Sequence, residues 1–247
     1  MKTSNKILAG IVVLAFGLPV LSAFIIKAKI AKGDCITRRI EPDEVTLRKL
    51  RRPLPAGDFS VVKFSGVGGN LSCTLYGSDT SGYSTKSENI MGDSVRLHCL
   101  NDTLYVDFIQ KPRKGTQVYY DIIKMALFVK SAKTIVVSET HLTIANPGEI
   151  SSDLSVKIQA DTPYGSSTSV LVQADRPDYR SGRKLTLDAN GGSILIHPSN
   201  PADTLALELR GDTKLELPVP VHHVIGRIGD SVEVKGNWKE LRELPRR

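Results

Sequence analysis

The chain has 247 residues, 40% of them hydrophobic and 24% charged, with 33 Lys/Arg against 26 Asp/Glu and a formal net charge of +7. This length suits one β domain with an appendage. The whole positive excess lies in residues 1–52, which hold eleven basic and four acidic side chains, while the rest is formally neutral. Because nucleic-acid binders concentrate positive charge on the folded surface, this distribution argues against a nucleic-acid partner.

After a short tail, residues 1–6, comes an uncharged segment, residues 7–26, with the sequence ILAGIVVLAFGLPVLSAFII. A helix of this length crosses the ~30 Å hydrocarbon layer of a bilayer. We predict an uncleaved transmembrane helix that anchors the chain in the lipid bilayer. The alternative is a signal peptide cleaved near residues 20–22, but the apolar run continues past that point through Ile26.

Residues 27–57 form a basic juxtamembrane linker. A short helix is predicted over residues 44–51, since acidic side chains come before its start, basic ones stand at its end and Pro53 stops it. Clusters of basic residues beside a membrane span commonly bind anionic lipid, although an ordinary solvated linker has the same composition. The candidate lipid-facing basic patch comprises Lys27, Lys29, Lys32, Arg38, Arg39, Arg48, Lys49, Arg51 and Arg52.

Short strands are predicted throughout residues 58–247. Residues 59–64 and 71–75 flank the glycine-rich sequence GVGGN, which we interpret as a turn because no amphipathic helix follows it. Residues 95–99 and 104–108 flank Asn101 and Asp102 and predict a hairpin or tight corner. Residues 118–129 are apolar on both faces and are the candidate for the most buried strand. Two shorter strands follow at residues 135–137 and 142–144.

Alternation of apolar and polar residues is clearest in the second half of the chain. Because successive side chains on a strand point to opposite faces, this pattern gives each strand one apolar and one wetted face. We predict an all-β fold, a parallel β-solenoid, with an antiparallel β-sandwich as the alternative. The strands concerned are residues 154–160, 184–189, 193–196, 205–209 and 214–217, with a last strand at residues 232–234.

Three cysteines and five histidines show no metal-binding spacing. Cys73 shares a strand face with Leu71 and Leu75, and Cys99 shares one with Val95 and Leu97, so both are expected to be buried free thiols, or else a disulfide if their strands are neighbours. Cys35 is left over. His222 and His223 are adjacent, so on a strand they face opposite sides and cannot readily share one metal ion.

Four acids, Asp153, Asp161, Asp175 and Asp188, recur near predicted turns. Lined up on one face with basic residues, such acids would suit an enzyme acting on acidic polysaccharides, but turn capping explains them more simply. The basic residues concerned are Lys157, Arg176, Arg180 and Arg183. No catalytic motif or phosphate-binding loop is present. We therefore predict no catalytic residue, no cofactor and no metal, and we place the binding surface on a sheet face or in the loops at residues 111–115 and 176–183.

The lysine-rich start and single hydrophobic span, the sequences FSVVKFSG (59–66), DTLYV (102–106) and LSVKI (154–158), and the repeated strands after them resemble one known family. The resemblance is to the putative auto-transporter adhesin, head GIN domain family of bacterial envelope proteins, over approximately residues 58–236. It implies stacked parallel β coils, export from the cytoplasm and no catalytic residues.

Charges flanking the span favour a cytoplasmic domain by the positive-inside rule, whereas the resemblance favours export. We expect an extracytoplasmic domain. The leading function hypothesis is a membrane-anchored, non-enzymatic envelope protein that acts in adhesion or surface interaction, with a protein or glycan partner. The alternatives are an accessory subunit or sensor of a membrane complex and, third, a polysaccharide-active enzyme.

Overall fold

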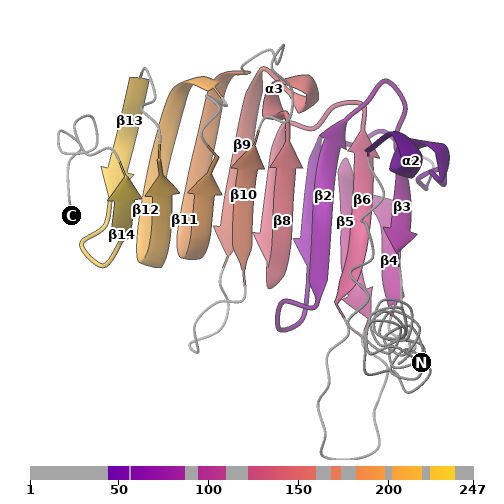
Figure 1. Cartoon of the computed structure of the whole chain (residues 1–247), viewed down its shortest axis with the longest axis horizontal. Helices are drawn as coiled ribbons and strands as arrows, with labels where there is room; N and C mark the ends of the chain where they lie inside the picture. The colour runs from indigo at the N-terminus through magenta and orange to yellow at the C-terminus, as the bar shows by residue number, and fades with distance from the viewer. Residues whose placement is uncertain are drawn as a thin grey trace, which may run out of the picture. The chain divides into compact units, whose positions relative to one another are not determined.

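A computed structural model describes residues 44–55, 57–86, 94–109, 122–159, 168–173, 182–197, 202–218 and 223–236. Their strands form one mixed sheet (Figure 1). No helix among these residues is long and apolar enough to span a membrane. The predicted transmembrane segment, residues 7–26, lies outside the described residues, so the anchor stays a prediction.

Two short helices and fourteen strands make up the described chain. The helices are α2 (Glu44–Lys49) and α3 (Pro147–Ile150). The strands of the first half are β1 (Val61–Ser65), β2 (Leu71–Gly77), β3 (Gly82–Lys86), β4 (Ser94–Leu100), β5 (Thr103–Ile109), β6 (Ile123–Val129), β7 (Thr134–Ser138) and β8 (Thr140–Ala145). Those of the second half are β9 (Asp153–Gln159), β10 (Ser169–Gln173), β11 (Gly182–Ile196), β12 (Ala202–Leu217), β13 (His223–Ile228) and β14 (Glu233–Gly236).

The sheet consists of two ladders that share the long strands β11 and β12. The first ladder runs β4-β5-β1-β7-β9-β11-β12-β13. The second ladder runs β3-β6-β2-β8-β10-β11-β12-β14. Along the chain, β1, β5, β7, β9 and β13 of the first ladder each precede a strand of the second. Figure 1 shows the strands side by side, from β13 and β14 at one end to β3 and β4 at the other.

Most neighbouring strands run parallel, which contradicts the antiparallel β-sandwich alternative. The described pairings that are antiparallel are β4 with β5 and β3 with β6, both at one end of the ladders. A strictly parallel sheet is therefore also wrong, because the chain reverses there through a hairpin. Strand order also departs from chain order, since β1 pairs with both β5 and β7.

Alternate side chains of both ladders point into a single core. In β2 and β5, for example, buried residues alternate strictly with half-buried ones. Val62, Leu104, Ile135, Leu187 and Leu207 are all fully buried members of this core. Each such side chain stabilises the fold by about 1.5–3 kcal/mol relative to an exposed one.

Buried threonines hold the corners where the chain passes from the first ladder to the second. The hydroxyl of Thr213 accepts a hydrogen bond from the Gly191 amide at 2.9 Å and donates one to the Arg210 carbonyl at 2.5 Å. The Thr168 hydroxyl accepts one from the Glu139 amide at 2.8 Å. Because a corner leaves the sheet ladder, these side chains satisfy backbone groups that would otherwise be buried without partners.

Several predicted elements are confirmed. Asn101 and Asp102 have φ values of 47° and 62° and form the two-residue turn of the β4–β5 hairpin, as such tight turns require. GVGGN is a turn, with positive φ at Gly68 and Gly69. Residues 123–129 of the predicted buried segment form β6, in which every side chain except Lys124 is buried. Residues 118–121 lie outside the described residues.

Three strands were not predicted, and two strands are longer than predicted. No strand was predicted at β3, β10 or β13, whose alternation is short or interrupted by glycine. The two predicted strands at residues 184–189 and 193–196 are one bent strand, β11, and the same holds for β12. Positive φ at Gly191, Gly192 and Gly211 allows those bends.

The last strand of each ladder contains a glycine pressed against its neighbour. Gly226 in β13 has a φ of 126°, and a Cβ there would lie 1.8 Å from the carbonyl oxygen of Leu207. Gly236 in β14 has a φ of 130° and stands in the same relation to Leu217, at 1.9 Å. Only glycine adopts this extended positive-φ conformation without strain.

We predict that Gly226→Ala lowers the free energy of unfolding by about 2–4 kcal/mol, because the methyl group adds both a backbone clash and φ strain. Urea unfolding of the full chain in detergent, followed by circular dichroism, measures the loss. Gly229→Ala is the matched control, since its Cβ would meet the nearest atom at 3.2 Å and no positive φ is involved. Equal effects of the two substitutions would contradict the prediction.

Candidate functional site

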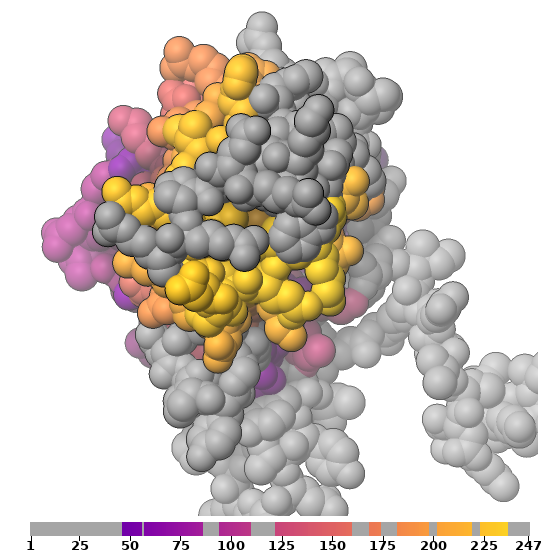
Figure 2. All heavy atoms as spheres, turned by 90° about the vertical axis from the view of Figure 1, so that its left-hand side faces the viewer, coloured from indigo at the N-terminus to yellow at the C-terminus, as the bar shows by residue number. Residues whose placement is uncertain are grey.

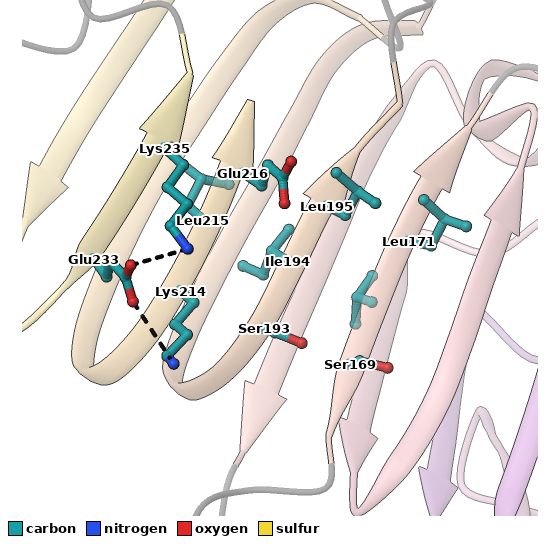
Figure 3. Close-up of a pocket in the computed structure, with 11 residues that line it drawn as sticks. Ser169, Leu171, Ser193, Ile194, Leu195, Lys214, Leu215, Glu216, Glu233 and Lys235 are labelled. Carbon is teal, nitrogen blue, oxygen red and sulfur yellow. Dashed lines mark ion pairs between the residues drawn. The ribbon is translucent and has the colours of Figure 1, made fainter. Parts of the chain in front are cut away.

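A shallow trough of about 350 Å³ lies on the outer face of the second ladder, across β10, β11, β12 and β14. Figure 3 shows its residues on four neighbouring strands that come from distant parts of the sequence. We define the trough by its outward side chains, Ser169, Leu171, Ser193, Leu195, Lys214, Glu216, Glu233 and Lys235.

Strand alternation and register together line these side chains up in two rows. Val170, Ile194 and Leu215 point into the core, so the residues on either side of each point out. The register pairs Ser169 with Ser193, Ser193 with Lys214 and Lys214 with Glu233 in the first row. The second row contains Leu171, Leu195, Glu216 and Lys235 in the same way.

The apolar part of the trough is the pair Leu171 and Leu195. These two residues face each other across β10 and β11 on the solvent side of the sheet, and both are half-buried. The hydroxyls of Ser169 and Ser193 lie beside them in the adjacent row. An apolar pair on an otherwise polar outer face offers area for a ligand to bury.

The charged part of the trough is an ion-pair network around Glu233. Its carboxylate lies 3.2 Å from the Lys235 ammonium and 3.7 Å from the Lys214 ammonium (Figure 3). A hydrogen bond from Lys235 and the charges of Lys235 and Lys214 lower the pKa of Glu233 below its ordinary value. The carboxylate is ionised at neutral pH, and two ammonium groups lie beside it.

A histidine on the neighbouring strand β8 lies beside the first row of trough residues. His141 Nδ1 lies 2.6 Å from Ser169 Oγ, and the two residues are register partners on β8 and β10. A serine–histidine pair is reactive when a third group orients the imidazole. His141 is exposed, and among the described residues Ser169 is the hydrogen-bond partner of its ring. We interpret the pair as a cross-strand contact.

The predicted acids are only partly within the described residues. Asp153 pairs with Arg183 at 2.9 Å, and Asp188 pairs with Arg210 at 2.6 Å. Both acids lie on the outer face of the first ladder, away from the trough. Since Lys157 is the register partner of Asp188, the two acids are offset by four residues, or about 13 Å along the strands. Asp161, Asp175, Arg176 and Arg180 lie outside the described residues.

The basic patch is likewise only partly described. Arg48 donates hydrogen bonds to Ser78 Oγ at 3.0 Å and to the Gly77 carbonyl at 3.1 Å, and its guanidinium lies 5.3 Å from the centre of the Phe128 ring. Arg51 donates to the Thr80 carbonyl at 2.9 Å. These contacts hold α2 against the domain, while the side chains of Lys49 and Arg52 are exposed. Lipid contact stays a prediction; the patch members outside the described residues are Lys27, Lys29, Lys32, Arg38 and Arg39.

Cys73 and Cys99 are free thiols. Cys73 is buried as predicted, and burial raises the pKa of its thiol far above the ordinary value. Cys99 is only half-buried, and loss of solvent raises its pKa as well. They lie on β2 and β4, which belong to different ladders and are not neighbours, so the disulfide alternative is wrong. Cys35 lies outside the described residues.

No metal-binding cluster of three or more His, Cys, Asp or Glu residues occurs within the described part of the chain. His223 is exposed on β13, and His222 lies outside the described residues, as do the predicted binding loop at residues 111–115 and residues 176–181 of the second loop. A sheet face was one of the predicted binding surfaces, but none of the trough residues was predicted as part of a site. The Ser-Val-Leu-Val alternation of residues 169–172 could have revealed an outward leucine, but not which strand lies beside it.

Comparison with known proteins gives no family match. No family model matches the chain, and no curated protein matches it, so the resemblance to the head GIN domain family stays a prediction. Two solved structures are similar over most of their length. One is a putative adhesin from Parabacteroides merdae ATCC 43184, 16% identical, covering 74% of this chain and 79% of that chain, with a TM-score of 0.39. The other is a putative adhesin from Bacteroides fragilis NCTC 9343, which is 14% identical; the match covers 75% of this chain and 93% of that chain, with a TM-score of 0.37. Likeness at this level decides neither family nor ligand.

We predict that Glu233→Gln destabilises the protein at neutral pH and has no such effect in acid. Because the folded-state pKa of Glu233 is lowered, its ion pairs stabilise the fold above the ordinary carboxyl pKa and are lost as the pH falls through the lowered value. Melting temperatures of both proteins across the acid range measure the difference. Added salt reduces it at neutral pH, since the network is exposed. A difference that is constant with pH would contradict this assignment.

Proposed function

We propose that this chain is a membrane-anchored, non-enzymatic cell-envelope protein whose β domain binds a protein or glycan partner through the trough. Residues 7–26 would anchor it in the bilayer, and the domain would face away from the cytoplasm. The observation that carries the binding role is the outward pair Leu171 and Leu195, which lies beside the serine hydroxyls and on the same face as the Glu233 ion-pair network. Such a surface combines apolar area with polar groups that can orient a ligand.

We propose further that the domain is a two-sided parallel β-solenoid, altered at one end. Successive chain segments alternate between the two ladders from β7 to β14, and their neighbours in each ladder are parallel. The antiparallel strands β3 and β4 would then cap the end of the solenoid. Stacked coils of this kind present long rows of outward side chains, which suit recognition of an extended partner.

Three features support binding over catalysis. Asp153 and Asp188 are paired with arginines and lie farther apart than the roughly 5–10 Å over which two carboxylates cooperate in glycoside hydrolysis. Cys73 is buried and its raised pKa keeps it a thiol, which is a poor nucleophile. The contact between His141 and Ser169 is exposed to solvent.

We predict that a photo-crosslinking amino acid at position 195 of the full chain, expressed in its own cells, gives one discrete adduct. The same amino acid at position 186, on the outer face of the first ladder but on the same strand, is the control. Adding Leu171→Glu to the position-195 protein should abolish the adduct, because a carboxylate removes the apolar contact area. Identical adducts from positions 195 and 186 would exclude the trough as the binding surface.

We predict that the protein stays in the membrane pellet after alkaline carbonate extraction, and that proteinase added to intact spheroplasts degrades its β domain. The apolar span of residues 7–26 accounts for the first result and an extracytoplasmic domain for the second. A cytoplasmic enzyme that remains intact is the control for spheroplast integrity. A β domain that survives until the membrane is breached would place it in the cytoplasm.

A further inference from the structure

The ladders end in four strands whose outer edges have no full strand partner within the described residues. These strands are β3 and β4 at one end and β13 and β14 at the other. The edge of a sheet presents unpaired N–H and C=O groups, onto which another strand can add unless the edge is blocked. The four edges differ in whether they are blocked.

Three of the edges carry a specific obstacle. The outer edge of β3 is already paired at Tyr83, whose amide and carbonyl exchange hydrogen bonds with Arg52 at 2.9 and 2.7 Å. Gly226 within β13 adopts a φ of 126°, a conformation that interrupts a regular strand, and β14 is only four residues long and ends at Gly236, whose φ is 130°. Figure 2 views the domain from the end where β13 and β14 lie.

The backbone edge of β4 carries neither kind of obstacle, although residues 55–57 lie against its Cys99 side chain, whose Sγ is 3.9 Å from the Pro55 carbonyl oxygen. Its seven residues, SVRLHCL, contain no glycine or proline and have no positive φ. Within the described residues, the backbone hydrogen bonds of β4 go to β5. Val95 and Leu97 are only half-buried on the core side, and Leu100 is 56% exposed on the outer side. An added strand would therefore gain backbone partners and bury apolar area.

Charge at this edge selects the kind of strand that fits. Arg96 is exposed and has no ion-pair or hydrogen-bond partner in the described structure. The carboxylate of Asp107, its register partner, lies 3.5 Å from the His98 imidazole. His98 stacks on Tyr105 with ring centres 4.8 Å apart and so stays in place. The outer row of β4 thus offers one free guanidinium beside an unpaired edge.

We propose that the free edge of β4 is a strand-addition site for an extended segment of another polypeptide that places a carboxylate opposite Arg96. Backbone hydrogen bonds to the edge supply affinity, and the alternate side chains supply selectivity. Val95 and Leu97 receive the apolar residues of the incoming strand, and Arg96 pairs with its acidic residue. This site is separate from the trough, so either can fail without the other.

The test uses the full chain in detergent micelles and a fluorescein-labelled peptide of sequence Thr-Val-Thr-Val-Glu-Val-Thr. In an antiparallel pairing its fourth residue faces Leu97 and its fifth faces Arg96. Fluorescence anisotropy should show that Arg96→Glu weakens binding about fivefold, the change expected when an attractive cross-strand pair becomes a repulsive one. A peptide with Lys at the fifth position should bind the Arg96→Glu protein as the original binds the unchanged protein.

Two controls make the result specific. Arg227→Glu changes an exposed arginine on the blocked strand β13 and should leave peptide binding unchanged. A peptide with proline at the fourth position should not bind, because it disrupts backbone pairing. Equal binding of the proline peptide, or no effect of Arg96→Glu, would overturn the proposal. Concentration-dependent dimerisation without peptide, abolished by Arg96→Glu, would also overturn it by showing that a second copy occupies the edge.

Discussion

The domain depends on one constraint: in the strands of both ladders every second residue must point inward, so that the apolar side chains share one core. On a strand, a slip of a single residue would reverse inside and outside. At each corner, the chain must therefore enter the strand of the second ladder so that its apolar residues again point inward. Gly191 and Gly192 allow the bend in β11, and the hydroxyl of buried Thr213 accepts a hydrogen bond from the Gly191 amide at this bend. The same arrangement recurs where Thr168 bonds the Glu139 amide.

The register that builds the core also builds the outer surface. Ser169, Ser193, Lys214 and Glu233 are far apart in sequence, yet successive parallel pairings put them in one row. The central side chains of these rows, such as Leu171, Leu195 and Glu216, each stand between two buried residues of their own strand. The chemistry of the trough can nevertheless vary freely, since outward residues take no part in core packing. The outer surface can therefore differ in chemistry from one row to the next while the core stays the same.

The two ends of the ladders play different roles. At the β13 and β14 end, Gly226 lies within β13 and Gly236 ends β14, and charged side chains such as Arg227 and Lys235 are exposed. At the other end, residues 48–52 contact the domain, because Arg48 and Arg51 bond to residues 77–80 and Arg52 pairs with β3. Among the described basic residues of this segment, Arg48 and Arg51 hold α2 in place, whereas the side chains of Lys49 and Arg52 are exposed. Among the described strands at the ends of the ladders, β4 has an outer backbone edge that is neither paired nor altered by a glycine.

Local features could be predicted from the amino-acid order alone, because they depend on residues a few positions apart. Alternation identified most strands and their buried faces, and Asn101-Asp102 identified the hairpin, since both signals act over two to four residues. The strand neighbours could not be predicted in this way: the fold places β1 between β5 and β7, and Leu171 beside Leu195. Any inward leucine or valine can pack against any other, so apolar patterning specifies burial but not partner. The trough and the open edge of β4 both depend on partner choice, and neither could be located from the sequence for that reason.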